Sequence, residues 1–94
     1  MQENILIVDD DEDLSNIISD MLEDYGYHVS RAEDSKAAFA LLSENTYHLI
    51  LLDINLPDSS GFELCEELRK VSTVPVIFAS ARTSETDRIA GFDK

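Results

Sequence analysis

The sequence predicts an α/β fold in which a parallel sheet carries helices on both of its faces. Short, almost uninterrupted apolar runs alternate along the chain with segments whose apolar residues recur every three or four positions. Runs of the first kind are typical of strands buried on both faces, and segments of the second kind are typical of amphipathic helices. The resulting order, β-α-β-α-β-α-β-α, implies parallel strands joined by right-handed crossovers.

The first half of the chain is expected to form two strands and two helices. Residues 4–8 are an apolar run, and residues 27–32 form a second, shorter strand. Between them, one apolar face of a helix is formed by Leu14, Ile17, Ile18, Met21, Leu22 and Tyr25. Gly26 is expected to end this helix, because a glycine commonly follows the last helical residue. Asp34 or Ser35 can cap the second helix.

The second half repeats the alternation. Residues 49–53 form a third strand that ends in an aspartate, and a loop rich in turn-forming residues follows at 54–61. A third helix is expected over residues 62–70. The fourth strand covers residues 75–79 and has its proline at the first position, where a proline costs least. Residues 84–87 resemble a capping box and predict a last helix.

Length and composition restrict the classes of function. The 94 residues are enough for one domain. With 20 acidic and 7 basic residues the net charge is −13, so we expect no direct nucleic-acid binding, which needs a cationic surface. No segment approaches the roughly 18 apolar residues of a membrane span and no signal peptide opens the chain, so we expect no membrane partner and a cytoplasmic location. The single cysteine, Cys65, excludes an internal disulfide.

Carboxylates follow two of the predicted strands at the point where each strand ends. Asp9 and Asp10 follow the first apolar run, and Asp53 closes the third strand. In an open α/β sheet, ligands bind beyond the carboxyl ends of the strands, so we expect these three acids to converge there. Three close carboxylates repel one another unless a cation lies between them. The pattern therefore predicts a magnesium-dependent acidic site.

Alternative interpretations of these acids fail at specific positions. An acid after a strand is often a helix N-cap, but Asp11 or Glu12 can serve as the cap here. The spacing also resembles the start of an EF-hand, yet Leu14 replaces the required Gly and Asp20 the closing Glu. Haloacid-dehalogenase phosphatases need a second Asp two residues after the nucleophile, where this chain has Asn55. No glycine-rich nucleotide-binding motif occurs.

Three segments resemble the receiver domain of two-component response regulators, namely residues 5–11 (ILIVDDD), 51–61 (LLDINLPDSSG) and 75–82 (PVIFASAR). They occur in the family's order and at its spacing, and together they span the chain. The resemblance implies the receiver fold, a flavodoxin-like doubly wound parallel sheet. It also implies a phosphoacceptor signalling domain, whose aspartate receives a phosphoryl group from the phosphohistidine of a sensor histidine kinase.

The same resemblance implies a role for each site residue. Asp53 would be the phosphoacceptor, and Ser80 the switch hydroxyl that binds a phosphoryl oxygen. Asp10 and Asp53 would bind Mg²⁺ through their carboxylates, Asn55 through its backbone carbonyl and Asp9 through a water molecule. In this interpretation the protein is a self-phosphorylating and self-dephosphorylating substrate rather than a turnover enzyme.

Residues 1–94 are expected to be a receiver domain that is incomplete at its C-terminus. A complete member of the family has a fifth strand, a fifth helix and a lysine at the end of that strand. Lys94 lies about one strand too early to be this lysine. The fourth strand would then be an apolar sheet edge, which favours a homodimer or a swapped assembly.

Two further expectations concern the parent protein and an alternative function. Arg82 and residues 91–93 resemble regulators whose receiver precedes a winged-helix DNA-binding domain, so phosphorylation would switch an attached output domain. The alternative is a non-phosphorylated receiver-like domain that acts by interaction or dimerisation. The missing lysine favours this alternative, whereas the intact acids and Ser80 argue against it.

Overall fold

The computed structural model describes residues 3–79, which form four strands and three helices. In chain order these are β1 (Asn4–Val8), α1 (Glu12–Asp24), β2 (His28–Ala32), α2 (Ser35–Glu44), β3 (Leu49–Asp53), α3 (Gly61–Arg69) and β4 (Val76–Ala79). The predicted alternation is confirmed for this part of the chain, with boundaries that differ by one or two residues. The helix expected from residues 84–87 lies outside the described residues, as does Ser80.

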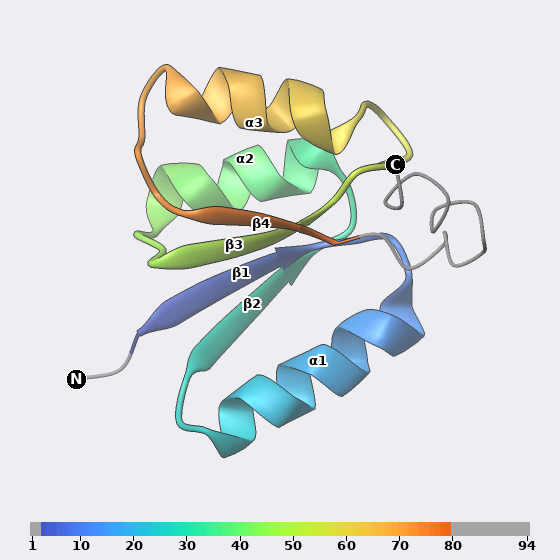
Figure 1. Cartoon of the computed structure of the whole chain (residues 1–94), viewed down its shortest axis with the longest axis vertical. Helices are drawn as coiled ribbons and strands as arrows, with labels where there is room; N and C mark the ends of the chain where they lie inside the picture. The colour runs from blue at the N-terminus through green and yellow to red at the C-terminus, as the bar shows by residue number, and fades with distance from the viewer. Residues whose placement is uncertain (1–2, 80–94) are drawn as a thin grey trace, which may run out of the picture.

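The four strands form one parallel sheet in the order β2-β1-β3-β4. Helix α1 covers one face of this sheet, and α2 and α3 cover the other (Figure 1). The predicted doubly wound, flavodoxin-like fold is therefore confirmed. The chain progresses in one direction from β1 to β2 and in the opposite direction from β1 through β3 to β4. The carboxyl ends of β1 and β3 thus form the topological switch point, where ligands bind in folds of this kind.

The core lies mainly between the two central strands and the helix pair α2 and α3. Leu6 and Val8 of β1 are completely buried, as are Ile50 and Leu52 of β3. These side chains belong to one cluster with Ala38, Leu64 and Leu68 of the two helices. Ile5 and Ile7 are also buried and alternate with the residues of that cluster, so they point to the face that α1 covers. Burial on both faces explains why β1 is apolar at every position after Asn4.

Helix α1 buries only part of its predicted apolar face. Ile17, Met21 and Tyr25 are 58%, 57% and 79% exposed, whereas the small polar residues Ser15 and Ser19 are buried. The helix packs mainly along β2, which is a strand at the edge of the sheet, so only a narrow strip of its surface contacts the sheet. The remaining residues of the predicted apolar face are half-buried, namely Leu14, Ile18 and Leu22.

Strand β4 has a strand neighbour on one side only among the described residues. Ile77 and Phe78 are 52% and 38% exposed, and the ring of Phe78 lies 4.9 Å from that of Phe62 on α3. The expected apolar edge is therefore present, while the expected assembly through it remains a prediction. Within residues 3–79, every helix is too short or too polar to cross a lipid bilayer.

Candidate functional site

The fold brings three aspartates together at the switch point of the sheet. Asp9 and Asp10 lie in the connection between β1 and α1, and Asp53 is the last residue of β3. One carboxylate oxygen from each lies within 4.8 Å of those of the other two. The predicted convergence of these side chains is thus observed, and it follows from parallel pairing of β1 with β3.

Local hydrogen bonds hold two of these carboxylates. Asp9 Oδ1 accepts a hydrogen bond of 2.9 Å from the backbone N–H of Asp11, and Asp53 Oδ1 accepts one of 3.1 Å from that of Asn55. The N–H of Asp9 donates to the carbonyl of Ala32, which ties the loop to β2. The cap of α1 is Asp11, whose carboxylate accepts from the Leu14 N–H, so neither Asp9 nor Asp10 is used as the helix cap.

The three acids differ in how far their side chains are buried, and burial affects the pKa of a carboxyl group. Asp9 and Asp53 are 8% and 2% exposed, whereas Asp10 is exposed. Burial raises the pKa of Asp9 from 3.8 to about 6; the hydrogen bond from Asp11 opposes this effect, and the charges of Asp53 and Asp10 add to it. Carboxylates that lie this close repel one another, and a small divalent cation that prefers oxygen ligands would relieve this repulsion. The residues present therefore fit a magnesium or similar ion.

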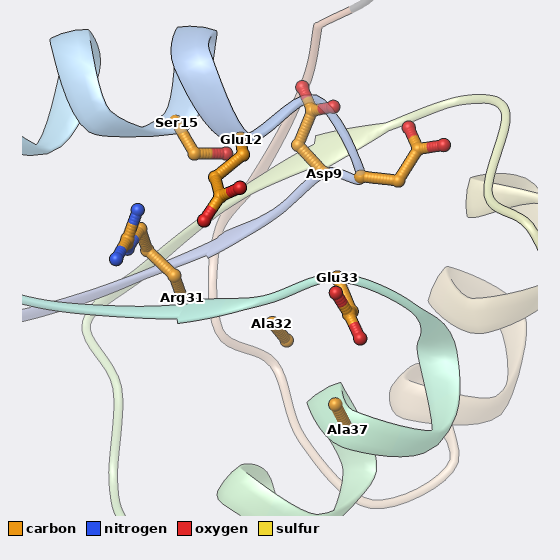
Figure 2. A pocket seen from close by; sticks show the side chains of 8 residues that line it. Asp9, Glu12, Ser15, Arg31, Ala32, Glu33 and Ala37 are labelled. Atoms are coloured by element: carbon orange, nitrogen blue, oxygen red, sulfur yellow. The ribbon is translucent and has the colours of Figure 1, made fainter.

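A cavity of about 520 Å³ opens beside these acids, between the start of α1, the end of β2 and the start of α2 (Figure 2). It is lined by Asp9, Asp10, Glu12, Ser15, Arg31, Ala32, Glu33 and Ala37. Arg31 is the basic residue in this lining, and its guanidinium donates to the side-chain carbonyl of Asn16. The sequence analysis missed Arg31. Arg31 is the second-last residue of β2, so it lies near the carboxyl ends of the strands, as the acids do. This position in the predicted strand could have identified it.

The loop after β3 folds back tightly beside Asp53. The N–H of Gly61 donates to the carbonyl of Ile54 over 2.7 Å, and Asn55 forms a bridge with Ser60. A Cβ atom on Gly61 would lie 2.2 Å from the backbone oxygen of Asp53, so only glycine fits at this position. The start of α3 is thereby packed directly against the end of β3. The backbone of Asn55 is held next to the acids.

Comparison with known proteins identifies the family of this chain. The family model for the response regulator receiver domain matches residues 5–94. The chain belongs to the response regulator receiver domain family. This result confirms the resemblance drawn from the three sequence segments and makes the chain part of a signalling protein.

Two relatives of this receiver domain are named as transcriptional regulatory proteins. It is 42% identical over 91 residues to the uncharacterized transcriptional regulatory protein YrkP of Bacillus subtilis. It is 39% identical over 89 residues to the transcriptional regulatory protein CpxR of Klebsiella pneumoniae. These matches cover 97% and 95% of this chain but 39% and 38% of the relatives. The chain thus spans about two fifths of the length of these relatives.

Solved receiver structures share the fold. A two-component response regulator from Clostridium difficile is 35% identical with a TM-score of 0.80, over 82% of this chain and 64% of that one. The chemotaxis response regulator CheY4 of Vibrio cholerae is 30% identical with a TM-score of 0.82, over 89% and 72% of the two chains. The response regulator TrrA of Thermotoga maritima, solved in complex with Mg²⁺ and BeF, is 27% identical with a TM-score of 0.80, over 97% and 80%.

Proposed function

We propose that Asp53 is the phosphoacceptor of a magnesium-dependent phosphotransfer, with the phosphohistidine of a sensor histidine kinase as the donor. The observation that carries this proposal is the convergence of the Asp9, Asp10 and Asp53 carboxylates within 4.8 Å at the switch point of the sheet. Membership of the receiver family supports the same assignment. The TrrA structure contains Mg²⁺ and BeF, which is consistent with a metal and a phosphoryl-like group at such a site.

The proposed reaction needs positioning and charge neutralisation more than covalent assistance. A carboxylate oxygen of Asp53 forms the new O–P bond, while the donor's N–P bond breaks and its electron pair remains on the ring nitrogen. The N–H of Asn55 holds Asp53 Oδ1 and so orients the nucleophile. Ser80 is proposed as the switch hydroxyl on the basis of the family resemblance.

The proposed metal site uses the same residues. Asp10 and Asp53 would bind Mg²⁺ through their carboxylates, Asn55 through its backbone carbonyl and Asp9 through a water molecule. The bound ion would neutralise charge on the phosphoryl oxygens. The raised pKa of Asp9, which burial and its acidic neighbours cause, supports a need for positive charge at this point.

The biological consequence is a switch rather than turnover. Phosphorylation of the domain would shift an equilibrium between an inactive and an active conformation. The relatives' names support a DNA-binding output domain in the parent protein. We propose that the receiver regulates such a domain in the cytoplasm without contacting nucleic acid itself, because its net charge is −13.

Intact-mass measurement after incubation with acetyl phosphate and Mg²⁺ tests the proposal. We expect one added phosphoryl group on the wild type, and none with EDTA or in the Asp53→Asn variant. Asp20→Asn changes the same charge at an exposed position of α1 and should be phosphorylated normally. A folded wild-type protein that gains no phosphoryl group would refute the assignment of Asp53.

The exposed apolar edge of β4 supports one alternative, a receiver-like domain that acts by dimerisation without phosphorylation. Ile77 and Phe78 are the side chains that such an interface would cover. Sedimentation of the chain with and without acetyl phosphate separates the two functions. A dimer that is indifferent to the phosphodonor, combined with no mass increase, would favour the alternative. Release of many equivalents of phosphate would instead indicate a phosphatase.

A further inference from the structure

The loop between β3 and α3 is fastened to the start of α2 by Asp58. Asp58 Oδ1 accepts a hydrogen bond of 3.0 Å from the backbone N–H of Ser35. Asp58 Oδ2 accepts one of 2.8 Å from the Ser35 hydroxyl and one of 3.2 Å from the backbone N–H of Lys36. A single carboxylate thus makes three hydrogen bonds to the first two residues of a helix that lies earlier in the chain.

These bonds complete the N-terminus of α2. The first N–H groups of a helix have no partner within the helix. Asp34, the N-cap, accepts from the N–H of Ala37 over 2.8 Å. Asp58 accepts from the two N–H groups that precede it. The hydrogen bond from the backbone of Ser35 is the main cause that lowers the pKa of Asp58. An ionised carboxylate at this position carries the negative charge that a helix N-terminus favours.

The other end of the same loop reaches the acidic site. The N–H of Gly61 closes the base of the loop on the carbonyl of Ile54, and Leu56 donates to Ser59 across it. The N–H of Asn55, next to this base, donates to Asp53 Oδ1. A series of short hydrogen-bonded segments therefore connects the start of α2, through the loop, with the carboxylate of Asp53.

We propose that Asp58 is a positioning residue for the acidic site. By holding the tip of the loop on α2, Asp58 restricts the backbone at Asn55. That backbone holds the Asp53 carboxylate and carries the carbonyl proposed as a metal ligand. A loop that is ordered before the metal arrives loses less conformational entropy on binding. The effect on metal binding rests on the function proposed above, whereas the effect on loop order does not.

Two variants of the full chain separate this role from simple helix capping. Asp58→Ala removes the tie between the loop and α2, and Asp34→Ala removes the other cap of the same helix without touching the loop. Amide hydrogen exchange of Asn55 and Gly61 is measured without metal, and the Mg²⁺ dissociation constant by titration. For Asp58→Ala we expect about tenfold faster exchange and about three- to tenfold weaker Mg²⁺ binding.

Asp34→Ala should leave both quantities near their wild-type values. Asp58→Asn, which keeps one acceptor oxygen, should fall between the wild type and Asp58→Ala, and it replaces the alanine variant if that does not fold. Three outcomes would each overturn the proposal. Amide exchange in the loop could be unchanged in both Asp58 variants, or the Asp34 and Asp58 variants could have equal effects. Exchange could also be faster in the Asp58 variants while their Mg²⁺ affinity is unchanged. Failure of the wild type to bind Mg²⁺ would instead refute the proposed metal site, and the exchange comparison would still decide the role of Asp58.

Discussion

Replacing Asp9 with asparagine should stabilise the metal-free protein at neutral pH. Asp9 is 8% exposed, and burial beside two other acids raises its pKa from 3.8 to about 6. The folded protein therefore binds this proton more tightly than the unfolded chain does, and stability falls as the pH rises through this interval. The difference between the two pKa values corresponds to about 3 kcal/mol at pH 7, because one pKa unit is worth about 1.4 kcal/mol.

Asparagine avoids this loss because it carries no charge, and its side-chain oxygen retains an acceptor for the N–H of Asp11. Urea denaturation in EDTA should show a gain of about 1–3 kcal/mol for Asp9→Asn at pH 7. The gain should shrink to about 0.5 kcal/mol near pH 4, where the folded wild type carries a protonated Asp9 and the unfolded chain is only partly ionised at this residue. Addition of Mg²⁺ should narrow the difference, because the ion stabilises the wild type more strongly.

Asp20→Asn provides the control, since Asp20 is an exposed acid on α1 and its replacement changes the net charge equally. Its stability should stay within about 0.5 kcal/mol of the wild type. An Asp9→Asn variant that gains nothing at pH 7 would refute the reasoning. A gain of the same size at pH 4 would also refute it, because the stabilisation would then have a cause other than carboxylate repulsion.

Two further comparisons test the fold around the site by urea denaturation. Gly61→Ala should cost about 2–4 kcal/mol, because the new Cβ would lie 2.2 Å from the backbone oxygen of Asp53. Gly26 has a φ of +97°, but a Cβ atom there would meet nothing within 4 Å, so Gly26→Ala should cost only about 1 kcal/mol. If the two glycine variants lost equal unfolding free energy, this would contradict the close approach at Gly61. Leu6→Ala should cost about 2–5 kcal/mol of unfolding free energy, because Leu6 is 0% exposed. Ile17→Ala should cost less than about 1 kcal/mol, because Ile17 is 58% exposed. Comparable losses for the two variants would contradict the packing described for β1 and α1.

The sequence alone was enough to predict the secondary structure of residues 3–79, the fold class and the three acids of the site. Each of these depends on local patterns. The apolar runs before Asp9 and at Asp53 specify strands buried on both faces, and parallel pairing then brings the strand ends to one edge. The helix boundaries were readable because capping uses neighbours in the chain, as Asp11 at α1 and Gly26 after it show.

The tertiary structure alone decided how these elements contact one another. The sequence pattern of α1 does not reveal that Ser15 and Ser19 are buried while Ile17 remains exposed, because the side of the helix that is buried depends on where the helix crosses the sheet. Asp58 reads as an ordinary turn residue, and its bonds to Ser35 depend on the packing of a loop against a helix distant in the sequence. The raised pKa of Asp9 likewise arises only after folding, since burial and neighbouring charges are properties of the assembled site.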